Sequence, residues 1–105
     1  MLVQTHTDRN IEGHEELARH VEEEVRSSLA HYTDRLTRVE VFLGDENSAR
    51  KAGAADKRCT VEARPAGLRP VAATHDAETV ELALNGALDS VRRALGHAIG
   101  KLRSH

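Results

Sequence analysis

Apolar residues recur at every third or fourth position in the last part of the chain, from Asp76 to Arg103. This spacing is typical of one face of an amphipathic helix, so it predicts a closing helix that Thr74 or Asp76 caps. The residues of the predicted buried face are Val80, Leu84, Ala87, Val91, Leu95, Ala98 and Leu102. The residues of the predicted outer face are Gly86, Asp89, Arg93, Gly96 and Gly100, flanked by Arg92 and Lys101.

A second helical pattern begins near Gly13 and continues to Tyr32. Its apolar positions are Leu17, Val21, Val25, Leu29 and Tyr32. Glu15 and Glu16 fall in the first turn, where the partial positive charge of a helix N-terminus favours acidic side chains. The pattern therefore predicts a helix over residues 13–32.

Four other stretches are rich in alternating apolar and polar residues, which is typical of strands with one buried face. They are Leu2–Thr7, Leu36–Leu43, Lys57–Arg64 and Leu68–Thr74. The inward side chains expected on the two middle strands are Val39, Val41, Leu43, Cys59, Val61 and Ala63. The outward ones are Arg38, Glu40, Phe42, Arg58, Thr60, Glu62 and Arg64. The residues from Gly44 to Asp56 are predicted to form a polar loop.

The elements follow one another in the order β-α-β-β-β-α, which indicates an α+β fold. A helix between the first two strands favours a right-handed parallel crossover, and the later connections favour antiparallel pairing. Because each helix has a single apolar face, we expect two helices packed on one face of a four-stranded mixed sheet. The other sheet face should be polar and open to water or to a partner.

The chain has 105 residues, so we expect a single domain over residues 1–105. Its core must be aliphatic, because Tyr32 and Phe42 are the only aromatic residues. No apolar run reaches the roughly 20 residues that span a bilayer, and the N-terminus lacks the zones of a signal peptide. The single cysteine, Cys59, suits a reducing compartment. We therefore expect a cytoplasmic protein that does not bind a membrane.

The net charge of −2 is unevenly distributed along the chain. Residues 1–49 hold five basic and eleven acidic side chains, whereas residues 50–105 hold ten basic and six acidic ones. The balance is therefore −6 in the first part and +4 in the second. This asymmetry is compatible with a local basic surface that attracts a polyanion, and equally with a mixed, solvated surface.

The residue types that metal binding or catalysis requires do not occur in a recognised pattern. The seven histidines include no pair at i, i+4, and the chain has no second cysteine, so we expect no metal site. Cys59 is predicted to be a small buried residue, and no motif supports a catalytic pair with His75. Since the chain also lacks a phosphate-binding loop and a nucleophile elbow, we expect neither a cofactor nor enzymatic activity.

Two RNA-binding modules offer a mechanistic comparison. An RNA recognition motif stacks bases on aromatic side chains of its sheet, but Phe42 is the only aromatic residue expected on the outer sheet face. A double-stranded-RNA domain has a basic cluster at the start of its last helix, where this chain has Asp76-Ala77-Glu78. The remaining mode is contact between dispersed arginines and phosphates, which requires no particular base sequence.

Several segments, taken with the order of elements, resemble one protein family. They are Arg38-Val39-Glu40-Val41-Phe42-Leu43, Ala83-Leu84-Asn85 and Leu88-Asp89, followed by Arg93. From Val3 to Leu102 the chain is similar to short members of the ribosome hibernation promoting factor family, whose sibling name is ribosome-associated inhibitor A. The resemblance implies a non-enzymatic, cytoplasmic protein that binds rRNA of the small ribosomal subunit in the mRNA and tRNA channel. It also implies that translation is silenced under stress or in stationary phase.

The resemblance further implies that basic residues on and beside the helices contact rRNA phosphates. Arg93 and Lys101 match basic positions on the family's last helix, whereas Arg92 is basic where the family is more often acidic. The predicted RNA-binding residues lie on the closing helix and on the strands: Arg92, Arg93, Lys101, Arg103, Arg38, Arg58 and Arg64.

Other positions depart from the family pattern. Ser90, Gly96 and His97 stand where members commonly carry Lys or Arg, and each lost contact should lower the salt dependence of binding. The second, C-terminal domain that lets long members pair ribosomes is not in this sequence, so we expect no pairing by that route. The alternative function is a homo-oligomeric module, for example a homodimer, or a protein-binding module that kept the fold and lost its affinity for ribosomes.

Gly96 and Gly100 on the closing helix allow two interpretations. Each costs about 1 kcal/mol relative to alanine inside a helix. The glycines could soften the end of the helix, or they could permit close approach of an RNA phosphate or of a second helix.

Overall fold

The computed structural model describes residues 1–9, 11, 13–45 and 55–103, with the side chains of 102 and 103 left out. Its elements are β1 (Leu2–Thr7), α1 (His14–Ser28), a 3-10 helix η1 (Ala30–Arg35), β2 (Leu36–Asp45), β3 (Lys57–Pro65), β4 (Val71–Ala77) and α2 (Val80–Arg103). The order of the main elements is β-α-β-β-β-α, as predicted.

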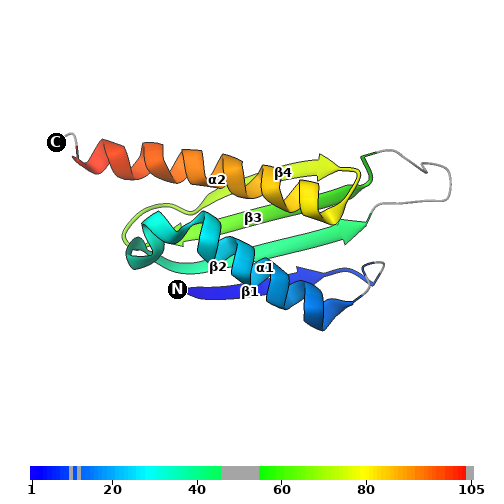
Figure 1. Cartoon of the computed structure of the whole chain (residues 1–105). Helices are drawn as coiled ribbons and strands as arrows, with labels where there is room; N and C mark the ends of the chain where they lie inside the picture. The colour runs from blue at the N-terminus through cyan, green and yellow to red at the C-terminus, as the bar shows by residue number, and fades with distance from the viewer. Residues whose placement is uncertain (10, 12, 46–54, 104–105) are drawn as a thin grey trace.

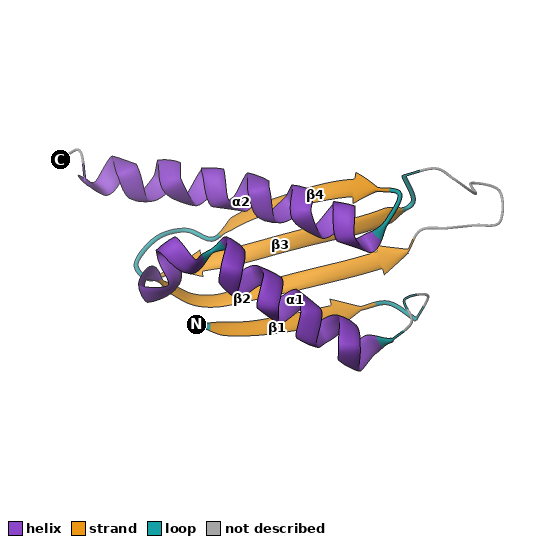
Figure 2. Cartoon of the chain, viewed as in Figure 1, coloured by secondary structure: helices purple, strands orange, loops and turns teal. Residues whose placement is uncertain are grey.

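The four strands form one mixed sheet in the order β1-β2-β3-β4. Strand β1 is parallel to β2, and both later pairs, β2 with β3 and β3 with β4, are antiparallel. Helices α1 and α2 lie on the same face of this sheet, α1 over β1 and α2 over β3 and β4 (Figures 1 and 2). The predicted α+β architecture is therefore confirmed.

The core lies between this sheet face and the two helices. The six side chains expected to point inward from β2 and β3 are all buried: Val39, Val41, Leu43, Cys59, Val61 and Ala63. Helix α1 contributes Val21 and Val25. Each fully buried leucine or valine side chain stabilises the fold by roughly 1.5–3 kcal/mol, so an aliphatic core suffices for a chain with two aromatic residues.

The boundary between the last strand and the last helix differs from the prediction. Strand β4 runs to Ala77, which pairs with Lys57, because the register with β3 continues past Thr74. Helix α2 starts at Val80, and its cap is Thr79, whose Oγ1 accepts a hydrogen bond from the Leu82 N–H at 3.1 Å. The predicted caps, Thr74 and Asp76, are strand residues instead.

The first helix is also shorter than predicted. Helix α1 ends at Ser28, and Tyr32 belongs to the 3-10 helix η1 that follows. Of the predicted loop from Gly44 to Asp56, the first two residues belong to β2, and residues 46–54 lie outside the described part of the chain.

The buried face of α2 is rotated slightly from the predicted one. Leu88 and Ile99 are buried, whereas Val80 and Ala98 are half-buried, and the side chain of Leu102 lies outside the described residues. The buried residues of α2 are Ala83, Leu84, Ala87, Leu88, Val91, Leu95 and Ile99.

Two glycines of the predicted outer face of α2 are packed against neighbouring elements. A β-carbon added at Gly86 would lie 2.2 Å from Cδ2 of His75 on β4. At Gly96 it would lie 2.9 Å from the hydroxyl oxygen of Tyr32 in η1, whereas at Gly100 it would meet nothing within 4 Å. The missing side chain at Gly96 thus leaves room for the Tyr32 side chain of η1.

Candidate nucleic-acid interface

The structure places the predicted RNA-binding residues on two opposite sides of the molecule. Arg38, Arg58 and Arg64 belong to β2 and β3 and point away from the helices, as predicted for the outer sheet face. Arg92, Arg93 and Lys101 lie on the exposed side of α2. One flat contact surface cannot include both groups, so the two groups are separate candidate interfaces.

Each of the three sheet arginines has an acidic neighbour on the same sheet face. Arg38 lies 3.3 Å from a carboxylate oxygen of Glu40, and it also donates a hydrogen bond of 2.6 Å to Gln4. Arg64 lies 2.9 Å from Glu62. A carboxylate beside each guanidinium offsets its attraction for phosphate, so this face has little net positive charge.

The third pair on the sheet joins Arg58 and Asp76, which are cross-strand partners of β3 and β4. The Arg58 Nε lies 2.8 Å from Asp76 Oδ1, and the second guanidinium nitrogen lies 3.2 Å from Oδ2. Hydrogen bonding to Arg58, and its positive charge, lower the pKa of the Asp76 carboxyl below its usual value, despite an opposing effect of burial. Asp76 is therefore ionised at neutral pH and pairs with Arg58.

The C-terminal half of α2 has a different charge balance. From residue 90 to residue 103 the chain carries four basic side chains and no acidic one. Arg92 and Arg93 both contact the carboxylate of Asp89 one turn earlier, Arg93 at 3.6 Å, and the Arg93 side chain is 71% exposed. Arg103 is the last residue of α2, and its side chain lies outside the described residues.

A further basic residue joins this group through tertiary packing. Arg35 of η1 lines a small hollow of about 100 Å³ together with His31, Tyr32, Gly96, Ile99 and Gly100. Arg35 therefore lies beside the C-terminal half of α2, although it is far from it in the sequence. We call Arg35, Arg92, Arg93 and Lys101 the basic end of the molecule; Asp34 and Asp89 are acidic residues of the same two elements.

The sequence did not single out Arg35, because nothing in its local pattern distinguishes it from other exposed arginines. The available signal was Gly96, whose missing side chain lets η1 approach α2. The basic end lies where η1, the β3–β4 turn and the C-terminal half of α2 come together (Figure 1).

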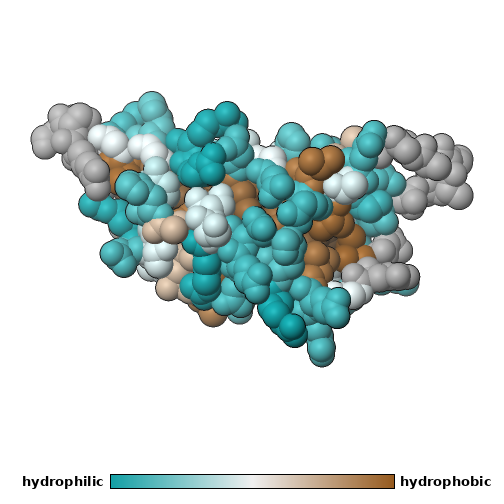
Figure 3. All heavy atoms as spheres, in the orientation of Figure 1, coloured by the Kyte–Doolittle hydropathy of each residue, from teal (hydrophilic) through white to brown (hydrophobic). Residues whose placement is uncertain are grey.

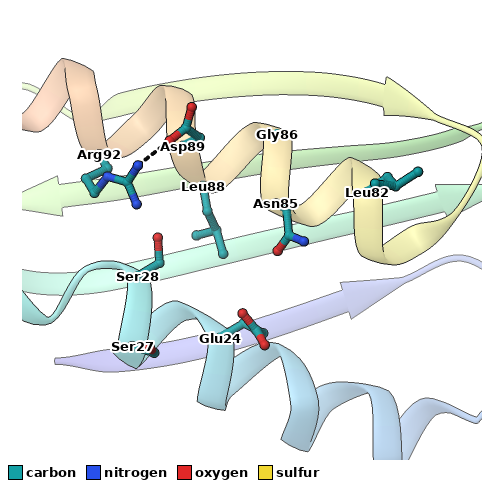
Figure 4. A pocket seen from close by; sticks show the side chains of 9 residues that line it. All are labelled: Glu24, Ser27, Ser28, Leu82, Asn85, Gly86, Leu88, Asp89 and Arg92. Carbon is teal, nitrogen blue, oxygen red and sulfur yellow. Dashed lines mark hydrogen bonds and ion pairs between the residues drawn. The ribbon is translucent and has the colours of Figure 1, made fainter.

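A groove of about 650 Å³ runs between α1 and α2. Figure 4 shows Glu24 and Ser28 of α1 facing Asn85 and Arg92 of α2 across it, with Arg92 directed toward Asp89. The other lining residues are Ser27, Leu82, Gly86, Leu88 and Asp89. Figure 3 shows this helix-bearing side as mainly hydrophilic, with apolar side chains visible between the helices. The lining offers hydrogen bonds and one basic group, but also two carboxylates.

The single cysteine, Cys59, lies in the core, where burial disfavours its ionised, nucleophilic form. Cys59 and His75 lie opposite each other on β3 and β4, so the two residues considered from the sequence as a catalytic pair are neighbours in the sheet. However, burial raises the pKa of the Cys59 thiol to about 12, and the His75 ring packs against Gly86. Without a thiolate the pair cannot act as a nucleophile and base at neutral pH.

Among the described helices, none combines the length and the apolar character that crossing a membrane requires.

Comparison with known proteins identifies a family and two similar folds. The family described as sigma 54 modulation protein / S30EA ribosomal protein matches residues 4–103. No curated protein sequence is significantly similar to the chain.

Two solved structures cover nearly the whole chain. A ribosomal subunit interface protein from Coxiella burnetii is 10% identical, with a TM-score of 0.68, over 95% of this chain and 99% of that one. The N-terminal domain of Protein Y from Thermus thermophilus is 19% identical, with a TM-score of 0.65, over 89% of this chain and 98% of that one. At these identities the similarity shows a shared fold.

Proposed function

Because the chain belongs to the sigma 54 modulation protein / S30EA ribosomal protein family, we propose that it binds the small ribosomal subunit and silences translation. Family membership confirms the resemblance to ribosome hibernation promoting factors that the sequence suggested. It also confirms that the chain is not an enzyme, since this family consists of ribosome-binding factors. A cytoplasmic location and action under stress or in stationary phase are parts of the same proposal.

The observation that carries the proposal is the basic end. Arg35, Arg92, Arg93 and Lys101 place basic groups on η1 and on the C-terminal half of α2, which has no acidic residue after Asp89. Such groups bind the phosphate oxygens of RNA whatever its base sequence, which suits contact with folded rRNA. Each of the three sheet arginines is paired with a different carboxylate, whereas Arg92 and Arg93 share the carboxylate of Asp89, so we assign the contact to the helix side.

The first test compares two matched double variants in a binding assay with purified small subunits. Arg93→Gln with Lys101→Gln removes two charges from the basic end, and Arg58→Gln with Arg64→Gln removes two from the sheet face. We expect the helix pair to weaken binding at moderate salt and to reduce the slope of log K against log salt by about 2, since each phosphate contact contributes about 0.9. The sheet pair should bind like the unmodified chain.

Two results would overturn this assignment. If the sheet pair loses affinity and the helix pair does not, the interface lies on the opposite face. If the unmodified chain sediments away from ribosomal particles of starved cells at both low and moderate salt, the ribosome is not its partner. Thermal unfolding of each variant provides the control for folding, because exposed substitutions usually change stability by less than about 0.5 kcal/mol.

The second candidate is a homo-oligomeric or protein-binding module, and one observation favours it. Phe42 is 43% exposed on the outer sheet face and stacks with His6 at a ring-centroid distance of 4.7 Å. The ion pairs around Phe42 carry no net charge in total, so this face is better suited to binding a protein than to binding a nucleic acid. Light scattering of the pure chain gives its oligomeric state and helps to separate the candidates. A chain that is strictly monomeric and that sediments together with small subunits would contradict the second candidate.

A further inference from the structure

Three metal-ligating side chains from two helices meet beside the groove. His20 and Glu24 lie one turn apart on α1, and Glu81 lies in the first turn of α2. The Nε2 atom of His20 is 2.5 Å from Oε2 of Glu81 and 4.0 Å from Oε1 of Glu24. One ligand atom of each residue falls within 4.8 Å of the other two.

We propose that His20, Glu24 and Glu81 bind a divalent transition-metal ion, with Zn²⁺ as the reference ion. One imidazole nitrogen and two carboxylate oxygens are a donor set that Zn²⁺ accepts, with water in the remaining position. Bonds of about 2.0–2.2 Å place tetrahedral ligands roughly 3.3–3.6 Å apart. The separations of His20 from Glu81 and from Glu24, 2.5 and 4.0 Å, lie on either side of this range, so small rotations of three partly exposed side chains would complete the site.

The charge of the three side chains also suits a divalent cation. A metal ion would displace the proton that His20 otherwise shares with Glu81, and the two carboxylates would then carry a charge of about −2 in total, which a divalent ion balances. Glu23, next to Glu24 in the sequence, adds negative charge close by. A nitrogen donor disfavours Mg²⁺ and Ca²⁺, which prefer oxygen ligands only, so the donor set points to the zinc class.

The spacing in the sequence indicates two of the three ligands, in a form that a search for paired histidines and cysteines misses. His20 and Glu24 are spaced i, i+4, which places them on the same side of a helix. Glu81 is 61 residues from His20, and only the packing of α2 beside α1 brings it into reach. A metal ion here would bridge the two helices, and it would bind the folded chain in preference to the unfolded one.

The test uses the full chain and does not depend on the proposed ribosomal function. Zn²⁺ is titrated calorimetrically into the metal-free protein near neutral pH, and thermal unfolding is measured with and without Zn²⁺. We expect one Zn²⁺ ion to bind per chain and to raise the melting temperature. When Co²⁺ is used in place of Zn²⁺, we expect the visible absorption spectrum of tetrahedral Co²⁺. His20→Asn and Glu81→Gln should each weaken binding by at least about tenfold and abolish the thermal shift.

Matched controls keep the result specific to this cluster. The first control is His97→Asn, which removes an exposed histidine of α2 outside the cluster and should not change the affinity for Zn²⁺. The second control replaces Zn²⁺ with Mg²⁺, which should not change the melting temperature of the unmodified chain. Glu24→Gln, which keeps the 2.5 Å contact of His20 with Glu81, should weaken Zn²⁺ binding if all three donors act together. Zn²⁺ binding that His20→Asn leaves unchanged, or binding only in the millimolar range, would overturn the proposal.

Discussion

At the scale of single residues, the arginines of this chain differ in what surrounds them. Arg58 and Arg64 on the sheet each lie within 3 Å of a carboxylate oxygen, and Arg38 lies 3.3 Å from one. Arg93 on α2 is largely exposed, and its ion pair with Asp89 is longer, at 3.6 Å. An exposed pair of this kind contributes little stability, so Arg93 can exchange Asp89 for a phosphate at small cost.

The Arg58–Asp76 pair predicts a pH effect. Because Arg58 lowers the pKa of Asp76 in the folded state, the pair stabilises the fold above the unfolded pKa of about 3.9. That contribution should be lost as the pH falls through the lowered folded pKa. An NMR titration should find the pKa of the Asp76 carboxyl below its usual range, and Arg58→Gln should return this pKa toward its unfolded value. An unchanged Asp76 pKa in the variant would show that Arg58 is not the cause.

Cys59 leads to a second prediction for a single residue. Its thiol is buried with a pKa of about 12, so almost no thiolate exists in the folded chain at pH values near 8. We expect a disulfide reagent to label the folded protein very slowly and to label the protein in denaturant at once. Rapid labelling of the folded protein would mean that β3 opens readily at this position.

At the scale of elements, the glycines of α2 show how a helix is adapted to its neighbours. Gly86 faces the His75 ring and Gly96 faces the Tyr32 hydroxyl, whereas Gly100 faces open space. The first two glycines permit close packing of α2 on β4 and on η1. Gly100 has no such packing reason.

Alanine substitutions should separate these roles. Gly86→Ala is expected to reduce the free energy of unfolding by about 1–3 kcal/mol, because the β-carbon overlaps the His75 ring. Gly100→Ala should leave stability unchanged or raise it by up to about 1 kcal/mol, since alanine is the better helix former. Urea unfolding at one pH measures both changes. Equal effects of the two substitutions would contradict the close packing of Gly86.

At the scale of the whole molecule, charge is separated along α2. Its first turn holds Glu81 beside the acidic side chains of α1, and its C-terminal half forms the basic end with Arg35. His20 belongs to the acidic side, where hydrogen bonding to Glu81 and the charges of Glu81, Glu24 and Glu23 raise its pKa. A polyanion should therefore approach the molecule by the C-terminal half of α2.

This separation predicts a modest salt dependence. The net charge of −2 provides no overall attraction to RNA, so binding depends on the few short-range contacts of the basic end. For three or four phosphate contacts, log K should fall against log salt with a slope of about −3 to −4. Equilibrium binding to small subunits at several salt concentrations measures the slope. A slope near zero would indicate a protein contact rather than an RNA contact.

Much of the fold followed from local patterns. Alternation along β2 and β3 correctly identified the six inward side chains, and the helical spacing correctly placed most of the buried face of α2. Arg92 and Arg93 were correctly expected to be exposed. Such patterns are informative because the repeat of a strand or helix decides which side chains share a face, wherever that element later packs.

The errors and omissions have a common physical origin. The end of β4 was misplaced because its length depends on pairing with β3, and Arg35 was missed because only packing brings η1 beside α2. Likewise, 18 residues separate Arg58 from Asp76, and 61 separate His20 from Glu81. The order of residues was enough for the elements and their faces, since these depend on neighbours along the chain. Which charges meet was decided by the tertiary structure, because the partners lie on different elements.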